Sequence, residues 1–139
     1  MKHQDLVVDD YTTPVPIVIG PSTTVTEAFA TMTEAGIRHL PVMDDGEVAG
    51  IVSDRDLRMV IGRTWGQKLT VAEIMQVTPM GVPVGTPLGD AAYIMSKYKV
   101  GSLLIFDAQG KLDGIFTYTD ALNALVELTS SNAGRLLGD

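Results

Sequence analysis

Apolar residues recur along the chain with two alternating periods. Val25, Ala28, Phe29 and Met32 follow the spacing i, i+3, i+4, i+7, which places them on one face of a helix. Short apolar runs bounded by glycine, proline and aspartate are typical of strands. The pattern predicts helices over 25–35, 54–61, 70–75, 88–95 and 118–128, and strands over 17–19, 37–43, 47–53, 81–84, 102–106 and 111–117.

The second half of the chain repeats the first. Equivalent residues coincide at a spacing of 63 and, after a one-residue insertion in the second hairpin turn, at 64; the pairs include Thr23/Thr86, Ala28/Ala91, Met32/Met95, Leu40/Leu103, Gly46/Gly110, Gly50/Gly114 and Asp56/Asp120. Each repeat has the predicted element order β-α-β-β-α. The predicted class is α/β (α+β), with two repeats packed sheet to sheet around a pseudo-twofold axis and clefts where they meet. We expect an N-terminal arm at 1–16, repeats at 17–66 and 67–128, and a tail at 129–139.

The composition of the chain excludes several classes of site and partner. The 139 residues include no cysteine and only two histidines, which excludes thiolate chemistry and a histidine-rich metal site. A net charge of −7 makes nucleic acid an unlikely partner. No stretch approaches the roughly 20 apolar residues of a membrane span, and the N-terminus lacks a signal-peptide core. We therefore expect a cytoplasmic protein.

One motif occurs in both repeats at matching positions. Gly50-Ile51-Val52-Ser53-x-x-Asp56 and Gly114-Ile115-Phe116-Thr117-x-x-Asp120 each place a hydroxyl residue and an aspartate at a predicted strand-to-helix corner. One reading is a capping box, worth about 1 kcal/mol per cap. The other is a ligand site, in which the helix start and hydroxyl suit phosphate and the short carboxylate suits a ribose. The glycine would let the backbone approach a ring, and the two readings are compatible.

With these motifs, the span from about Leu6 to Leu128 resembles a tandem pair of cystathionine-β-synthase (CBS) domains, a Bateman module. The likeness also rests on the Ile37-Arg38-His39-Leu40-Pro41-Val42 strand, the Asp-Gly turn and the Ile74-Met75 lead-in to the second unit. The resemblance implies a regulatory module that binds AMP, ADP, ATP or S-adenosylmethionine, without a catalytic cofactor or metal.

The resemblance also implies roles for particular residues. Asp56 and Asp120 would contact ribose. Ser53, Arg55, Thr117, Thr119, Arg38 and His39 would contact the ligand through hydroxyl, backbone or phosphate-binding groups. Adenine would lie near Ile17 and Val82. Arg38 and His39 would reach the ligand held by Asp120, or else form a solvated strand start with a hydrogen-bonded histidine. Their counterparts are Gly101 and Ser102, so we expect one site to suit a multiply charged nucleotide better than the other.

The last predicted helix is apolar nearly all round, which indicates burial on more than one side. It either packs within the monomer, against Leu136 and Leu137 of the tail, or forms a homodimer, as the helices after each motif do in the CBS family. Trp65 either packs in the connector between repeats or stacks on a base.

These observations leave three alternative functions. The first is a stand-alone nucleotide sensor that acts on an unidentified effector protein. The second is an interaction scaffold with vestigial sites. The third, an enzyme, lacks a nucleophile–base pair, metal ligands and a glycine-rich phosphate loop, and we expect none.

Overall fold

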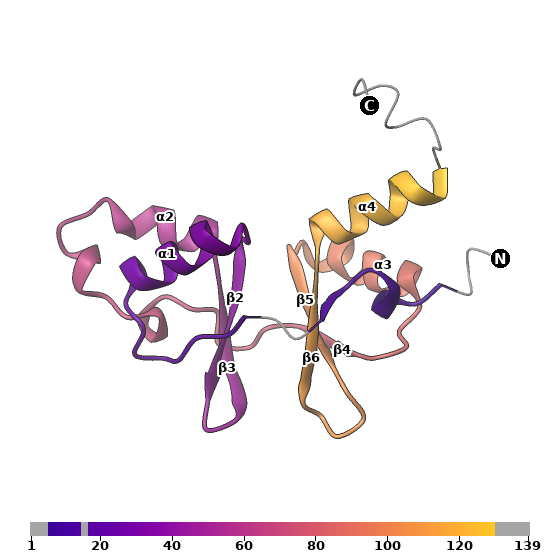
Figure 1. The fold of residues 1–139 in the computed structure, drawn as a ribbon, viewed down its shortest axis with the longest axis horizontal. Helices are drawn as coiled ribbons and strands as arrows, with labels where there is room; N and C mark the ends of the chain where they lie inside the picture. The colour runs from indigo at the N-terminus through magenta and orange to yellow at the C-terminus, as the bar shows by residue number, and fades with distance from the viewer. Residues whose placement is uncertain (1–5, 15–16, 130–139) are drawn as a thin grey trace. The chain divides into compact units, whose positions relative to one another are not determined.

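The computed structural model describes residues 6–14 and 17–129, which form two compact units. Unit 1 contains 6–14 and 80–129, and unit 2 contains 17–79. The predicted class is confirmed, because each unit combines a sheet with helices (Figure 1).

Unit 2 is built around one hairpin. Helix α1 (Val25–Ala35) leads to strand β2 (His39–Asp44), which pairs antiparallel with β3 (Glu47–Ser53) and is followed by α2 (Asp54–Ile61). The Asp-Gly turn forms as predicted: Asp45 and Gly46 have φ of 52° and 79°, the positive values that a tight hairpin turn requires. The connector contains two short 3-10 helices, η3 (Gly66–Lys68) and η4 (Val71–Glu73).

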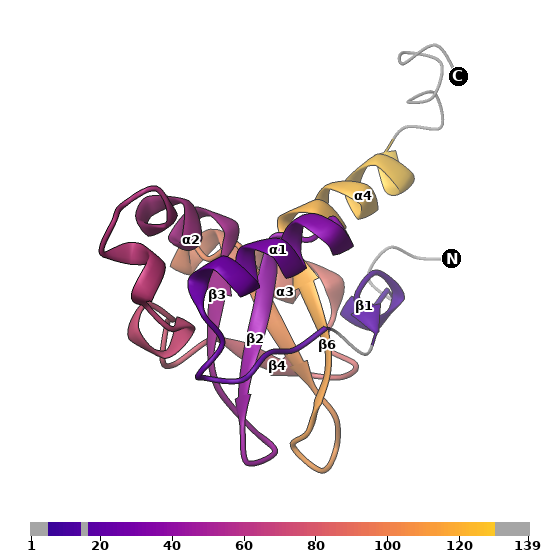
Figure 2. The same ribbon diagram turned by 60° about the vertical axis from the view of Figure 1, so that its left-hand side comes forward.

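Unit 1 repeats this arrangement with a fuller sheet. Strand β4 (Gly81–Pro83) precedes helix α3 (Leu88–Tyr98), strands β5 (Ser102–Phe106) and β6 (Leu112–Thr117) form the hairpin, and α4 (Tyr118–Thr129) follows. The N-terminal residues add η2 (Val8–Asp10) and strand β1 (Thr13–Pro14). The strand order is β1-β6-β5-β4, and Figure 2 shows β1 beside β6.

The segment that precedes each repeat packs on the other repeat. Residues 6–14 belong to the unit that holds the second repeat, and residues 67–79 to the unit that holds the first. The contacts are equivalent: Val8 N donates to Thr86 O and Val71 N to Thr23 O, both at 2.8 Å. Residues 6–14 of the predicted N-terminal arm are therefore the counterpart of the lead-in to the second repeat. The spacing of 63 residues, continued upstream to Val8 and Val71, carries this signal in the sequence.

Each unit has its own core, made of matching residues. Met32, Leu40 and Val52 are at most 2% exposed in unit 2, and so are Met95, Leu103 and Phe116 at the equivalent places in unit 1. We call residues 6–14 and 67–79 the exchanged segments, because each packs on the repeat that it does not precede. Val8 and Val71, from these segments, complete the two cores. The exchanged segments therefore contribute apolar burial as well as backbone pairing.

Two predicted elements differ in the structure. Residues 17–19 do not form a strand, since only Ile19 makes an isolated bridge, to Val42. The flanking Gly20-Pro21 ends the pairing, because proline has no N–H to donate. The helix predicted at 70–75 is the single 3-10 turn η4, whose Thr70 N donates to Glu73 Oε2 at 2.7 Å as a capping box requires. The predicted link at 130–134 lies outside the described residues.

The two equivalent helices end on different residues, and this predicts a stability difference. Gly36 ends α1 at φ 68°, whereas Lys99 ends α3 at φ 56°. A side chain in this left-handed conformation costs about 1 kcal/mol relative to glycine. We expect Lys99→Gly to stabilise the protein by up to about 1 kcal/mol and Gly36→Ala to destabilise it by a similar amount, as measured by urea unfolding. Equal stability of both variants and the wild type would contradict this reading.

Candidate functional site

The first corner joins β3 to α2, and its motif residues form a closed capping box. Ser53 N donates to Asp56 Oδ2 and Asp56 N donates to Ser53 Oγ, both at 3.1 Å. Asp54 N donates to Arg38 O at 2.7 Å, which joins the start of α2 to the residue before β2. The corner is therefore held on both sides, and the predicted cap is present.

The second corner joins β6 to α4 with the same geometry. Thr117 N and Thr117 Oγ1 donate to Asp120 Oδ2 at 2.8 and 3.2 Å, and Asp120 N approaches Thr117 Oγ1 at 3.5 Å. Tyr118 N donates to Gly101 O at 3.2 Å, as Asp54 does to Arg38. The sequence motif thus produces one backbone arrangement twice.

Capping uses only part of each aspartate. In both corners the bonds go to Oδ2, and within residues 6–14 and 17–129 no donor reaches Oδ1 of Asp56 or Asp120. Both residues are half-buried, so solvent still reaches them. A half-buried carboxylate with a free oxygen at a helix start can accept hydrogen bonds from a polyol. The capping and binding readings are thus compatible in this geometry.

The two corners differ in charge. Arg38, at the edge of the first corner, and Arg55, on the first turn of α2, are exposed. Arg58 Nε donates to Asp54 Oδ2 at 2.9 Å. The second corner has Gly101 and Thr119 in place of the first two arginines. The first corner therefore has two arginines for an anionic ligand at positions where the second corner has none.

His39 begins β2 opposite Ser53 and is half-buried. Burial, assisted by the Arg38 charge, lowers its pKa below the ordinary 6.5, although Asp56 and Asp54 oppose the shift. The structure thus places Arg38 and His39 in the unit of Asp56. A reach to a ligand held by Asp120 stays a prediction.

The lowered pKa of His39 predicts a pH dependence. The unfolded chain takes up a proton near pH 6.5, whereas the folded chain takes it up only at lower pH. The free energy of unfolding should therefore fall as the pH falls below 6.5. We expect His39→Gln to remove part of this fall, as measured by urea unfolding at intervals from about pH 7.5 to 5. Parallel curves for both proteins would contradict it.

The motif glycines have a packing role that the sequence did not predict. A Cβ on Gly50 would lie 2.6 Å from Gln76 O, and one on Gly114 would lie 2.8 Å from Thr13 O. These oxygens belong to the exchanged segments. The close approach that requires glycine at these positions is that of the protein's own backbone. The approach of a ligand ring stays a prediction.

The remaining candidates differ in accessibility. Ile17 is 47% exposed, but Val82 is 7% exposed and packs in the core of unit 1. An adenine near Val82 would therefore meet mainly its backbone. Trp65 is 57% exposed, so the packing role expected for it is at most partial.

Metal and membrane features are not found in the described part of the chain. Across residues 6–14 and 17–129, no group of three or more His, Cys, Asp or Glu residues is arranged to hold a metal ion. None of the helices in the same ranges has the length and apolar character to cross a membrane.

Curated proteins and solved structures resemble this chain over most of its length. A CBS domain-containing protein of Dictyostelium discoideum is 32% identical over 118 residues, covering 76% of this chain and 81% of that protein. The structure of CBSX2, a CBS-pair protein of Arabidopsis thaliana, in complex with AMP is 34% identical, with a TM-score of 0.73 over 88% of this chain and 97% of that one. The CBS domain pair of protein MJ0100, in complex with 5'-methylthioadenosine and S-adenosyl-L-methionine, is 25% identical, with a TM-score of 0.81 over 89% and 98%.

Some relatives are much longer. Inosine-5'-monophosphate dehydrogenase of Mycobacterium leprae is 32% identical over 126 residues, which are 88% of this chain but only 23% of that enzyme. The CBS domain family itself matches residues 8–63 and 71–127, two segments that begin at the equivalent Val8 and Val71. The chain belongs to the CBS domain family and carries two copies of that domain.

Proposed function

We propose that this chain is a regulatory module that binds adenosine-containing small molecules at its two corners. The observation that carries the proposal is the pair of half-buried aspartates, each fixed through Oδ2 and free at Oδ1 among the described residues. AMP, 5'-methylthioadenosine and S-adenosyl-L-methionine, the ligands named for the similar structures, share an adenosine. A ribose diol that donates to a fixed carboxylate is the simplest common mode of recognition.

Each candidate residue has a role in this proposal. Asp56 and Asp120 accept from ribose hydroxyls. Ser53, Thr117 and Thr119 supply hydroxyl or backbone contacts, while Arg55, Arg38 and His39 bind phosphate. Ile17 and the backbone of Val82 lie near adenine. The expectation that each ligand sits in a cleft where the repeats meet stays a prediction from the sequence.

The charge difference between the corners predicts unequal ligands. Three arginines and two aspartates surround the first corner. Of the five equivalent positions at the second corner, only Asp120 is charged. A nucleotide with several phosphates should bind more tightly where the arginines of the first corner contact it. A ligand with little negative charge should not need them and can bind at the second corner. Unequal sites would let one chain respond to the ratio of two adenosine compounds.

We also propose that the chain forms a homodimer through the helices that follow the motifs. Leu122, Leu125 and Val126 of α4 are 60%, 55% and 46% exposed, and Met59 of α2 is 68% exposed. The three α4 residues, at i, i+3 and i+4, form an exposed apolar stripe, which is typical of an interaction surface. The packing of α4 against Leu136 and Leu137, the alternative within the monomer, concerns residues outside the described ranges.

The dimer is tested by analytical ultracentrifugation. We expect the wild type to sediment as a dimer and Leu122→Asp to shift toward the monomer, because a charge in an apolar interface is costly. Asn123→Asp is the matched control, since it adds the same charge at the next exposed position of the same helix. A monomeric wild type, or equal sedimentation of both variants, would contradict the proposal.

The function is tested by titration calorimetry with AMP, ATP and S-adenosylmethionine. Binding of at least one of them at millimolar or tighter affinity is expected, and a nucleotide that copurifies would be identified by mass spectrometry. If none of the three compounds gives a heat of binding and no nucleotide copurifies, the proposal is contradicted. The exposed α4 stripe would then favour the second candidate, an interaction scaffold with vestigial sites.

The output of the module is a further proposal. A change in either unit on binding would be read by an effector protein, provided that the ligand binds two states with different affinity. We propose no catalytic activity for the chain, and assay of purified protein with bound nucleotide for turnover tests this. A cytoplasmic location stays a prediction, to be tested by cell fractionation.

A further inference from the structure

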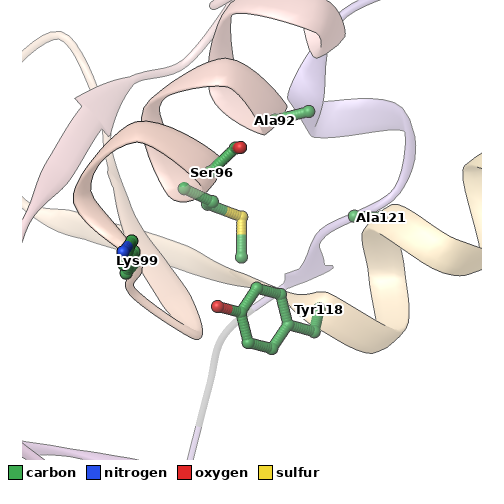
Figure 3. Close-up of a pocket in the computed structure, with 6 residues that line it drawn as sticks. Ala92, Ser96, Lys99, Tyr118 and Ala121 are labelled. Carbon is green, nitrogen blue, oxygen red and sulfur yellow. The ribbon is translucent and has the colours of Figure 1, made fainter.

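A groove of about 360 Å³ lies between α3 and α4, entirely within unit 1. Its lining consists of Ala92, Met95, Ser96, Lys99, Tyr118 and Ala121. Figure 3 shows Tyr118, at the start of α4, across the groove from Lys99 of α3. Tyr118, Leu122 and Leu125 lie at i, i+4 and i+7 of α4 and so share one face of that helix. The groove is therefore continuous with the exposed apolar stripe of the proposed dimer.

In unit 2, larger side chains occupy the equivalent place. At the positions of Ala92 and Ala121, the first repeat has Phe29 and Leu57. Leu57 is fully buried, Phe29 packs against the core, and the Arg58 guanidinium carbon lies 5.1 Å from the centre of the Phe29 ring. A phenyl ring and a leucine side chain in one unit are thus reduced to two methyl groups in the other.

Large apolar side chains are exposed mainly on the helices of unit 1. Six of them on α3 and α4 are at least 46% exposed: Tyr93, Tyr98, Tyr118, Leu122, Leu125 and Val126. On α1 and α2, whose residues are all described, Met59 is the one large apolar residue exposed to this extent. The positions equivalent to the six are Ala30, Ala35, Asp54, Arg58, Ile61 and Gly62. Unit 1 therefore has both a groove and the kind of side chain that fills one, whereas unit 2 has mostly small or charged residues at these positions.

A twofold dimer can place unit 1 against unit 1 of the partner or against its unit 2. Half of the residues of α2 are charged: Asp54, Arg55, Asp56 and Arg58. An apolar face laid on α2 would remove these charges from water, which is costly. By contrast, α4 carries the carboxylates of Asp120 and Glu127 and no basic residue, and Lys99 is the one charged residue of the groove. An α4 helix of the partner over the groove therefore matches apolar with apolar surface and brings carboxylates toward an ammonium group.

We propose that the homodimer is isologous through unit 1, and that the groove between α3 and α4 of each copy receives apolar side chains from α4 of the partner. Met95, which lines the groove and is 2% exposed, has a flexible thioether that adapts to an inserted side chain. This orientation rests on the homodimer of the proposed function and states which faces of the two copies meet. Because Asp120 caps the start of α4, the second corner and this interface share one helix.

Single cysteines test the orientation, since the chain has none of its own. Leu122→Cys, Leu125→Cys and Val126→Cys are each oxidised mildly, and covalent dimer is measured by nonreducing electrophoresis. An isologous interface brings α4 of one copy against α4 of the other near the twofold axis. Because a disulfide forms only between close Cβ atoms, at least one of these variants should form at least about fivefold more covalent dimer than Gln109→Cys. Gln109 is the control because it is exposed in the turn between β5 and β6, at the end of that hairpin away from α4.

A crossed dimer, with unit 1 of each copy on unit 2 of the other, predicts a different result. Met59, the exposed apolar residue of α2, would then lie opposite the α4 stripe. Covalent dimer that forms only when an α4 variant is mixed with Met59→Cys would overturn the proposed orientation and leave the homodimer in place. Cross-linking of all three α4 variants at the level of Gln109→Cys, in a protein that sediments as a dimer, would also overturn it.

Filling the groove is the second test. Ala92→Phe restores the residue of the first repeat and should raise the dimer Kd, measured by sedimentation, at least about tenfold, because the added ring takes the space of the partner's side chains. Ala30→Phe adds the same ring at an exposed position of α1 and should leave the dimer Kd unchanged within about twofold. Circular dichroism shows whether each variant is folded. Equal dimer Kd values for the wild type and folded Ala92→Phe would overturn the orientation alone, whereas a monomeric wild type would contradict the homodimer itself and the orientation with it.

Discussion

Asp56→Asn and Asp120→Asn should each weaken one adenosine site by about 10- to 100-fold, because a hydrogen bond to a charged group is worth about 1.5–3 kcal/mol. Asparagine keeps an oxygen that can accept from the Ser53 or Thr117 N–H, so the cap survives while the charge is lost. Titration calorimetry with the ligand that binds the wild type measures this. Where both sites are occupied, each variant should lose one of two binding events.

The control for this prediction is a capping box away from both corners. Glu73→Gln changes the same kind of acceptor, since Glu73 Oε2 accepts from Thr70 N at 2.7 Å at the start of η4. It should leave adenosine affinity unchanged. If both aspartate variants bind as the wild type does, the aspartates are helix caps only and the capping reading accounts for the motif.

Gly50→Ala and Gly114→Ala should each destabilise the protein by about 1–3 kcal/mol or more, as overpacking against a fixed backbone does. The added methyl group would lie 2.6 Å from Gln76 O in one case and 2.8 Å from Thr13 O in the other. Backbone oxygens cannot turn aside as a flexible side chain can, so the exchanged segment must move. The loss should appear in urea or thermal unfolding without any ligand present.

A third glycine gives the matched control. Gly89 lies in α3, and nothing is within 4 Å of a Cβ added there. Gly89→Ala should stabilise the protein by about 0.5–1 kcal/mol, since alanine is the better helix former. If Gly50→Ala and Gly114→Ala were as stable as the wild type, the close approach of the exchanged segments would not be what requires these glycines.

The local elements were predictable because their signals are local. The bounds of α1, β3, α2 and β5 match the prediction residue for residue, and Gly36 ends α1 as expected. Periodicity, turn residues and capping residues act within a few positions of one another, so one repeat is enough to reveal them. The capping boxes at Ser53 and Thr117 are of the same kind.

The repeat, its elements and the corner motif could all be read from sequence patterns, and so could the charge difference between Arg38 and Gly101. The folded chain was needed to show that each lead-in segment packs on the other repeat, and that the motif glycines make room for those segments. It alone showed that Val82 is buried in the core of unit 1. The physical reason is that these features depend on contacts between residues far apart in the chain, which no local period records, and on the volume that alanine leaves where its counterpart is phenylalanine or leucine.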